Sequence, residues 1–331
     1  MNIQKFTAAD GALAAALYNK YAEVEFVHKK LAEADFIDQF VTSTDRAIKI
    51  NMAAKAENGD MLGFASGCLV PGKDIGYITF VLVEGEARRQ GIAAQLLAAL
   101  EEALKAEAET NEALTALAKF QIIFFNPVAL TWIVPGTPGH DHPNAPGIDV
   151  ASDAYIFFKN QGYLDRVFQN SFYLPLDKFA FKPEVQAKID ALPEHDLSIT
   201  IYDPAKHYGL EELMDDLGSD DWREQILGNV AREDGGDPVI IAEHKGKAVG
   251  FTGPIRVQES GRGYFAGIGV HSEYRKYGLG KSLFSTLCQS LKDIGAGYMT
   301  LFTGETNPAR RIYASAGFKI VKTWSDMQKD I

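Results

Sequence analysis

Apolar and polar positions recur in one order in both halves of this 331-residue chain. Apolar residues spaced three to four positions apart predict helices, and alternating or continuous apolar stretches predict strands. The sequence "ENGD" at 57–60 is typical of a turn between two strands. The elements predicted for the first half are a strand near 3–6, helices over 11–24 and 33–42, and strands over 47–56, 61–70 and 77–83.

The second half repeats this order. It predicts strands over 197–202, 238–244, 248–257, 264–270 and 298–304, with helices over 208–218 and 307–318. The segment 177–196 contains two prolines and reads as a linker with a short helix. The sequence therefore predicts two α+β domains of one kind, at 1–176 and 197–331.

Each half also carries a basic, glycine-bearing turn between a strand and a long amphipathic helix. In the second copy, the stretch 271–291, Arg275, Gly278 and Gly280 stand in front of a long apolar helix. The first N–H groups of a helix lack partners within the helix, and the helix dipole favours negative charge there. Glycine lets a backbone approach an anion closely, and arginine adds a charge-assisted contact. The pattern indicates a phosphate site, with a purely structural turn as the alternative.

Other phosphate-binding motifs do not fit. The "GKS" at 280–282 lacks the earlier glycine of a P-loop, and no G-x-G-x-x-G occurs. The order Arg275-x-x-Gly278-x-Gly280, followed by "NPARRIYASAGF" at 307–318, resembles the GNAT superfamily of N-acetyltransferases. The first half has the same motif as Arg88-x-x-Gly91-x-Ala93. The resemblance covers nearly the whole chain, as two GNAT domains in tandem.

This resemblance implies a fold, a cofactor and a set of binding residues. Each domain would have a mixed, mostly antiparallel central sheet flanked by helices. The acyl donor would be acetyl-CoA, with its pyrophosphate on the turn and its pantetheine along the preceding strand. The residues implied for cofactor binding are Ile268, Gly269, Val270, Arg275, Lys276, Tyr277, Gly278, Leu279, Gly280, Lys281, Asn307 and Arg310.

The resemblance also favours the second half as the catalyst. Tyr313 occupies the position from which family members donate a proton to the departing CoA thiolate. When "SDAYIFFKNQGY" at 152–163 is laid over the second motif, Phe158 takes the place of Tyr313. Phenylalanine has no proton to give, so the first domain is predicted to be degenerate. A structural ring under the helix is the alternative for Tyr313.

No general base can be assigned from the sequence. Some relatives place a glutamate on the fourth strand to accept a proton from the amine, whereas Tyr264 and Tyr77 stand near that place here. Glu305 is a candidate, with an exposed loop carboxylate as the alternative. A chain of waters would also serve.

The first half contains a surplus of residues. Gly91 and Gly162 are 71 positions apart, whereas Gly278 and Gly317 are 39 apart, so 32 positions are extra. They fall largely in an insertion at about 126–150, rich in proline and glycine, which predicts a shaped loop. Trp132, His140 and His142 of this insertion, with Tyr264 and Glu305, are the candidate acceptor-binding residues. The insertion could serve as a surface loop, as a loop at the domain interface or as a wall of the substrate pocket, and the sequence leaves these three roles open. No metal site is predicted.

The composition of the chain argues against several classes of protein. The net charge of −11, without an extended basic run, argues against nucleic-acid binding. No apolar run approaches the length needed to cross a bilayer, and the N-terminus has no secretory pattern. Cys68 and Cys288 lie in separate halves and read as buried thiols, so a cytoplasmic protein is expected.

The sequence thus predicts an acetyl-CoA-dependent N-acetyltransferase that acts on an amine of a small molecule. The amine would attack the thioester directly, and the protein would be a monomer or homodimer. A protein N-acetyltransferase and a CoA-binding module without turnover are the alternatives.

Overall fold

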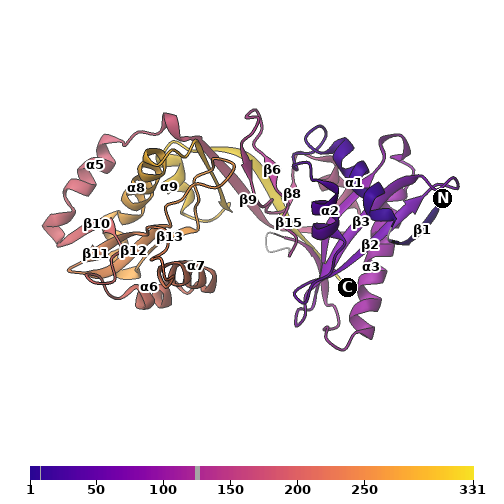
Figure 1. The fold of residues 1–331 in the computed structure, drawn as a ribbon, viewed down its shortest axis with the longest axis horizontal. Helices are drawn as coiled ribbons and strands as arrows, with labels where there is room; N and C mark the ends of the chain where they lie inside the picture. The colour runs from indigo at the N-terminus through magenta and orange to yellow at the C-terminus, as the bar shows by residue number, and fades with distance from the viewer. Residues whose placement is uncertain (8, 124–126) are drawn as a thin grey trace. The chain divides into compact units, whose positions relative to one another are not determined.

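The computed structural model describes residues 1–7, 9–123 and 127–331 of the chain. The chain divides into two compact units that interleave along the sequence (Figure 1). Unit 1 contains Met1–Pro138, His142–Asn170 and Lys322–Ile331, and unit 2 contains Gly139–Asp141 and Ser171–Val321. The predicted insertion begins at Asn126, which lies outside the described residues.

Unit 1 is a sheet with helices on both faces. Its strands follow the order β1-β2-β3-β4-β5-β15-β9. The neighbours from β1 to β4 pair antiparallel, and β4 pairs parallel with β5. The strands are β1 (Asn2–Lys5), β2 (Ile48–Lys55), β3 (Met61–Leu69), β4 (Ile75–Val83), β5 (Lys119–Ile122) and parts of β9 (Leu164–Pro175) and β15 (Lys319–Asp330). The helices are α1 (Asp10–Tyr21), α2 (Glu33–Phe40), α3 (Ile92–Thr110) and α4 (Asp153–Asn160), and short strands β6 (Trp132–Ile133), β7 (Asp141–His142) and β8 (Ile148–Asp149) belong to the insertion.

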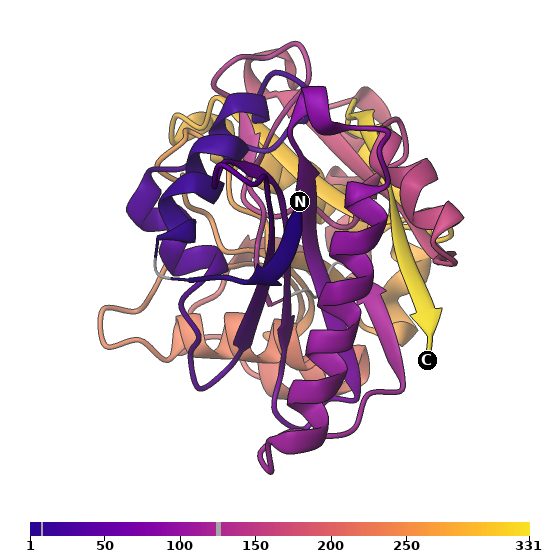
Figure 2. The ribbon, with the colours of Figure 1, turned by 90° about the vertical axis from the view of Figure 1, so that its right-hand side faces the viewer.

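Alternating residues of the strands build two cores. Along β3, Phe64 and Cys68 pack with α1 and α2, whereas Ala65 and Leu69 pack with α3 on the opposite face. Side chains of a strand point alternately to its two faces, which produces this division. Figure 2 shows α3 crossing one face of the unit 1 strands, with α1 and α2 on the other side.

Unit 2 has the same layers. Its first sheet has the order β10-β11-β12-β13, all antiparallel, and β14 is hydrogen-bonded to β9. Figure 1 shows α8 on one side of this sheet and α6 and α7 on the other. The elements are α5 (Pro183–Asp190), β10 (Leu197–Ile201), α6 (Leu210–Leu217), α7 (Asp220–Val230), β11 (Ile240–His244), β12 (Lys247–Gly253), β13 (Gly267–Val270), α8 (Leu279–Asp293), β14 (Tyr298–Gly304) and α9 (Arg310–Ser315), with 3₁₀ turns η2 (Leu176–Lys178), η3 (Leu192–His195) and η4 (Ser272–Tyr277). The 3₁₀ turn η1 (Gly85–Ala87) lies in unit 1.

The last strand of each half contributes to both units. Residues Met327–Asp330 of β15, from the second half, pair antiparallel with β5 of unit 1. Trp324 and Met327 of this strand are fully buried. Conversely, β9 of the first half lies beside β14 of unit 2. The sheet of unit 1 is therefore completed by residues from the far end of the sequence.

The α+β class, with mixed and mostly antiparallel sheets, is confirmed. The units differ from the three consecutive segments that the sequence suggested, because 322–331 lies in unit 1 and the linker 177–196 lies wholly in unit 2. The predicted strand over 264–270 is shortened to β13, which leaves Tyr264 outside it. Helix α7 was not predicted. Cys68 and Cys288 are both buried free thiols, as predicted.

Candidate functional site

The second glycine turn is built around one residue with left-handed backbone. Strand β13 ends at Val270, η4 follows, and Gly278 with φ +71° is the N-cap of α8. Most residues with a side chain are strained in this conformation. No side chain caps the start of α8. No side chain of the protein therefore competes with an anion for the first N–H groups of α8.

Basic side chains surround this turn. Arg275 is exposed, and its Nε donates a hydrogen bond of 3.3 Å to the carbonyl oxygen of Val270. Within the described part of the chain, Arg275 has no ion-pair partner. A pocket of about 330 Å³ opens here, with Arg275, Lys276, Tyr277 and Gly278 on one side and α5 with η3 on the other. The site therefore combines a helix N-terminus with cations that form no ion pair among the described residues, although the carboxyl of Asp216 interacts electrostatically with Arg275.

The other predicted turn residues have structural duties. A Cβ on Gly280 would lie 3.0 Å from Cδ1 of Ile312, so this glycine also permits α8 to approach α9 closely. Leu279 is fully buried in the core, which leaves only its backbone for a ligand. Lys281 is half-buried. The motif thus serves helix packing as well as anion binding.

Strand β13 is an edge of its four-stranded sheet. The N–H of His271 donates to the carbonyl oxygen of Val249 on the neighbouring segment. Because directions alternate along a strand, the backbone groups of Ile268 and Val270 face the opposite edge, where the carbonyl oxygen of Val270 accepts from Arg275. A Cβ on Gly269 would lie 2.4 Å from Cδ1 of Leu217, so that glycine makes room for α6. The edge can accept an extended ligand by backbone pairing.

Tyr313 lies in unit 2 on α9 and is 5% exposed. Its ring contacts Phe284, Phe172 and Phe265 at centroid distances of 5.0, 5.5 and 6.0 Å. Its hydroxyl has no hydrogen-bond partner among the described residues. Burial raises the pKa of Tyr313 well above its ordinary value. The phenol therefore stays protonated at neutral pH and can donate a hydrogen bond.

The segment before α9 is held by local hydrogen bonds. Asn307 Oδ1 accepts from the N–H of Ala309 at 2.9 Å, and Arg310 Nη1 donates to the carbonyl oxygen of Glu305 at 2.5 Å. Glu305 and Asn307 are exposed. These contacts shape the turn that positions α9, and the predicted ligand-binding roles of the three residues stay predictions.

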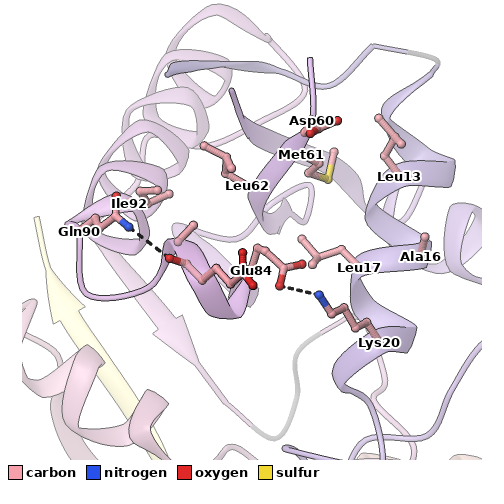
Figure 3. Close-up of a pocket in the computed structure, with 12 residues that line it drawn as sticks. Leu13, Ala16, Leu17, Lys20, Asp60, Met61, Leu62, Glu84, Gln90 and Ile92 are labelled. Carbon is pink, nitrogen blue, oxygen red and sulfur yellow. Dashed lines mark hydrogen bonds and ion pairs between the residues drawn. The ribbon is translucent and has the colours of Figure 1, made fainter. Parts of the chain in front are cut away.

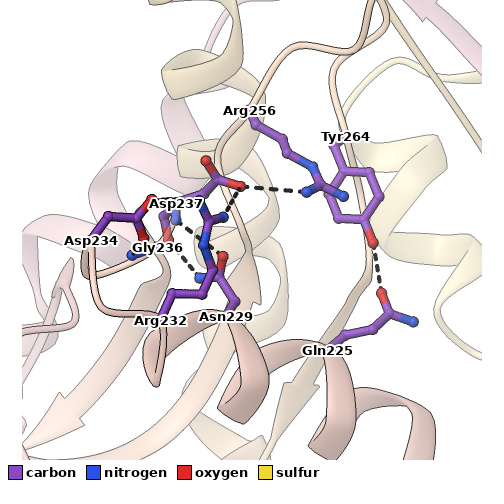
Figure 4. A network of polar contacts seen from close by, with 8 residues as sticks. All are labelled: Gln225, Asn229, Arg232, Asp234, Gly236, Asp237, Arg256 and Tyr264. Carbon is purple, nitrogen blue, oxygen red and sulfur yellow. Dashed lines mark hydrogen bonds and ion pairs between the residues drawn. The ribbon is translucent and has the colours of Figure 1, made fainter.

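Tyr264 belongs to a polar network rather than to strand β13. Its hydroxyl donates to Gln225 Oε1 at 2.6 Å, and the Arg256 guanidinium lies 3.8 Å from its ring centroid (Figure 4). Arg256 also reaches Asp237 at 3.5 Å. These partners hold Tyr264 in place, and its part in binding an acceptor remains untested.

The insertion is divided between the two units. Trp132 and His142 lie in unit 1, where both are buried and their rings stack with centroids 6.0 Å apart. His140 lies in unit 2, stacked on Tyr298 at 3.9 Å with Nδ1 2.8 Å from the hydroxyl of Tyr173. The pocket of unit 2 does not include any of the three. Each of the three side chains therefore packs within its own unit, and the readings of the insertion that the sequence left open stay open.

The first glycine turn repeats the backbone of the second. Gly91 has φ +80° and is the N-cap of α3, and Arg88 Nε donates to the carbonyl oxygen of Val83 at 3.0 Å. Here, however, Arg88 Nη1 lies 2.6 Å from Glu25, and the guanidinium lies 4.6 Å from the ring centroid of Tyr21. The guanidinium of Arg88 is therefore engaged by side chains of its own unit and is not free to bind an anion.

A pocket of about 660 Å³ adjoins this first turn and has acidic walls. Asp60, Glu84 and Glu86 line it, with Lys20 as the basic residue among them (Figure 3). Hydrogen bonds from Lys20 and Tyr21 lower the pKa of Glu84. A phosphate would meet negative charge here. Phe158 of α4 is buried and packs on Phe157 and Tyr163, as expected for a residue without a proton to donate.

Two negative findings concern the described residues. They contain no group of three or more His, Cys, Asp or Glu side chains arranged to hold a metal ion. None of their helices has both the length and the apolar character to cross a membrane. Sequence reasoning missed the wall formed by α5 and η3, because proline-bearing segments between domains usually read as connectors.

Comparisons with known proteins agree with this geometry. Three solved structures each match 99% of this chain at 14% identity. They are a GCN5-related glucosamine N-acetyltransferase region of a fungal multi-domain GH3 β-N-acetylglucosaminidase (TM-score 0.67, 38% of that chain), a GCN5-related N-acetyltransferase from Sphaerobacter thermophilus (0.61, 95%) and a tandem GNAT protein from the clavulanic acid biosynthesis pathway (0.58, 98%). This chain spans about two fifths of the first. No curated protein matches it significantly.

The family model for the acetyltransferase (GNAT) family matches residues 14–120 and again 199–318. Each match contains one of the two glycine turns, and the family uses acetyl-CoA. The tandem arrangement that the sequence predicted is confirmed. The chain belongs to the GNAT acetyltransferase family, in its tandem two-domain form.

Proposed function

We propose that unit 2 transfers an acetyl group from acetyl-CoA to an amine of a small molecule. The observation that carries this proposal is the combination, in one unit, of a pocket lined by cations and by no carboxylate with a protonated tyrosine that has no hydrogen-bond partner among the described residues. Unit 1 has neither feature, since Arg88 is paired with Glu25 and Phe158 stands in for the tyrosine.

The residues of unit 2 fit the parts of acetyl-CoA. Backbone N–H groups after Gly278, with Arg275, would bind the pyrophosphate. The open edge of β13 at Ile268 and Val270 would pair with the amide groups of the pantetheine. Held in this way, the thioester is positioned for attack, which is the main contribution of a protein to such a transfer.

The chemical step forms one bond and breaks another. The neutral amine attacks the thioester carbonyl carbon, the C–N bond forms, and the C–S bond breaks to release CoA as a thiolate. Because its pKa is raised, Tyr313 acts as a hydrogen-bond donor to the leaving sulfur, and full proton transfer to sulfur needs a solvent proton to replace the one given. The amine loses its proton to solvent or to a base that these residues do not identify.

The proposal is tested by acetyl transfer from acetyl-CoA to a panel of small amines, followed by mass spectrometry of the products. Product formation that falls in Tyr313→Phe, with acetyl-CoA affinity kept, supports it. Binding of acetyl-CoA without any turnover would favour a CoA-binding module. Transfer to peptides alone would favour a protein N-acetyltransferase.

A further inference from the structure

The second wall of the unit 2 pocket comes from the segment between the two sequence repeats. Lys188 on α5, with Ala191, Leu192 and His195, faces the turn residues Arg275–Gly278. All of these residues belong to unit 2. The nearest atom to a Cβ built on Gly278 is Nζ of Lys188, at 3.4 Å. The ammonium group therefore lies directly beside the start of α8.

This wall adds positive charge to the pocket. Lys188, Arg275 and Lys276 line it, together with His195, and no carboxylate does. Lys188 is exposed and, among the described residues, has no ion-pair partner. The rings of His195 and Tyr277 lie 5.0 Å apart, which fixes one side of η3 against the turn. Because the residues that line the pocket include cations and no carboxylate, the pocket favours a ligand with several negative charges.

We infer that α5 and η3 form a second wall of the acetyl-CoA site, in which Lys188 binds the phosphate on the ribose 3′ position of CoA. This inference rests on the proposed function of unit 2. Arg275 and the N-terminus of α8 already account for the pyrophosphate. Lys188 comes from the other wall and brings its ammonium group to the start of α8, so it adds a cation beside the pyrophosphate site for a second phosphate of the same ligand.

The test compares two ligands that differ in this one group. Acetyl-CoA and 3′-dephospho-acetyl-CoA are titrated calorimetrically into the wild-type protein, Lys188→Ala and Lys182→Ala. Lys182 is the exposed N-cap residue of α5 and does not line the pocket, so its variant carries the same charge change at a neighbouring place. Lys188→Arg tests whether a cation alone restores binding.

Lys188→Ala is expected to weaken acetyl-CoA binding by about threefold to tenfold, the range for a partly exposed charge-assisted contact. The dephospho ligand should bind wild type and Lys188→Ala alike, and Lys182→Ala should match wild type. Lys188→Arg should recover most of the loss.

An equal loss for both ligands would overturn the inference, because Lys188 would then contact the pyrophosphate or only hold α5 in place. Unchanged acetyl-CoA affinity in Lys188→Ala would overturn it as well. In both cases the wild-type protein still binds acetyl-CoA, and the proposed function survives. Wild-type protein that binds neither ligand would contradict the proposed function itself.

Discussion

Arg88 and Arg275 hold equivalent positions in the two units and are used differently. Both donate from Nε to the last carbonyl oxygen of the preceding strand, at 3.0 and 3.3 Å. Arg88 also pairs with Glu25 and lies over Tyr21, whereas Arg275 faces a pocket with Lys188 and Lys276. The motif preserves the shape of the turn, and the surrounding residues decide whether the turn can receive an anion.

The same lesson holds for the helix that follows later in each unit. Phe158 and Tyr313 are both buried aromatic residues in a hydrophobic core. They differ by one hydroxyl group, which in unit 2 has no hydrogen-bond partner among the described residues. Both units thus keep a buried aromatic ring at this position, but only unit 2 has the hydroxyl group that could donate a proton.

The largest expected effect concerns the strand that the second half supplies to unit 1. Trp324→Ala removes a fully buried ring that packs on Trp132 at 5.2 Å, and should destabilise unit 1 by about 3–5 kcal/mol. Hydrogen exchange should locate the loss of protection in unit 1. Ile320→Ala, at a 45% exposed position of the same strand, is the control. Ile320 lies in the part of β15 that belongs to unit 2, so equal protection of unit 1 in both variants would contradict the assignment of residues 322–330 to unit 1.

The next largest expected effect is on kcat, which should depend on Tyr313 and not on Phe158. Tyr313→Phe should lower kcat on the order of 10²-fold with acetyl-CoA affinity nearly unchanged, because the hydroxyl acts as the thiolate leaves. Phe158→Tyr should leave kcat unchanged. Since burial raises the pKa of Tyr313, the pH profile of kcat should show no ionisation of this phenol below about pH 10. An active Tyr313→Phe, with chemistry limiting, would return the residue to a packing role.

The two left-handed glycines give a matched pair. Gly278→Val and Gly91→Val each force a β-branched residue into positive φ, at a cost of about 1–2 kcal/mol to stability. Acetyl-CoA affinity should fall about tenfold or more in Gly278→Val alone, since only that turn is proposed to bind phosphate. Calorimetric titration of both variants measures this. Loss of affinity in Gly91→Val would show that unit 1 also binds the cofactor.

The two arginines should also differ in their effect on acetyl-CoA affinity. Arg275→Ala should weaken acetyl-CoA by about tenfold through the lost charge-assisted contact. Arg88→Ala should leave that affinity unchanged and weaken only the packing around Glu25 and Tyr21. If Arg88→Ala reduces binding as much as Arg275→Ala, unit 1 also binds the cofactor. A loss in Arg88→Ala alone would reverse the assignment of the active unit.

The smallest effect is a pH dependence confined to unit 1. Burial raises the pKa of Asp326 on β15 to about 6, against the opposing influence of Arg166. The folded state therefore holds an extra proton between about pH 4 and pH 6, and its stability falls as pH rises through that window. Asp326→Asn should stabilise unit 1 by about 1–2 kcal/mol at pH 7.5 and not at pH 4. Denaturation curves at the two pH values decide it, and a gain of equal size at both would rule out ionisation as the cause.

The local parts of the site could be read from the sequence because they depend on short-range chemistry. Both turns, the positive φ of Gly91 and Gly278, and the place of Tyr313 on a helix follow from residues within one strand-turn-helix segment. The pairing of Arg88 with Glu25 could not be read in this way, since the two residues are 63 positions apart. Long-range pairing is decided by the fold.

The strand exchange escaped prediction for a similar reason. The apolar residues of β9 and β15 indicate that each segment is a strand, but they do not indicate which strands it pairs with. The segment with α5 looked like a connector because Pro183 and Pro193 break regular patterns, although Pro183 stands at the first turn of a helix, where proline is tolerated. Helix α7 begins at a Ser219 cap that the weak apolar pattern around it did not reveal.

The exchange of β15 has a consequence for how the protein is made. Strand β5 ends at Ile122, and its partner β15 ends at Asp330. A ribosome that adds about 5–20 residues per second needs roughly 10–40 s to cover that interval. Throughout it, the nascent first unit presents the edge of β5 without its partner, and such an edge pairs readily with strands of other chains. On a polysome, neighbouring nascent chains compete with the late-emerging β15 for this position, and intermolecular exchange of that strand is the failure expected in crowded expression.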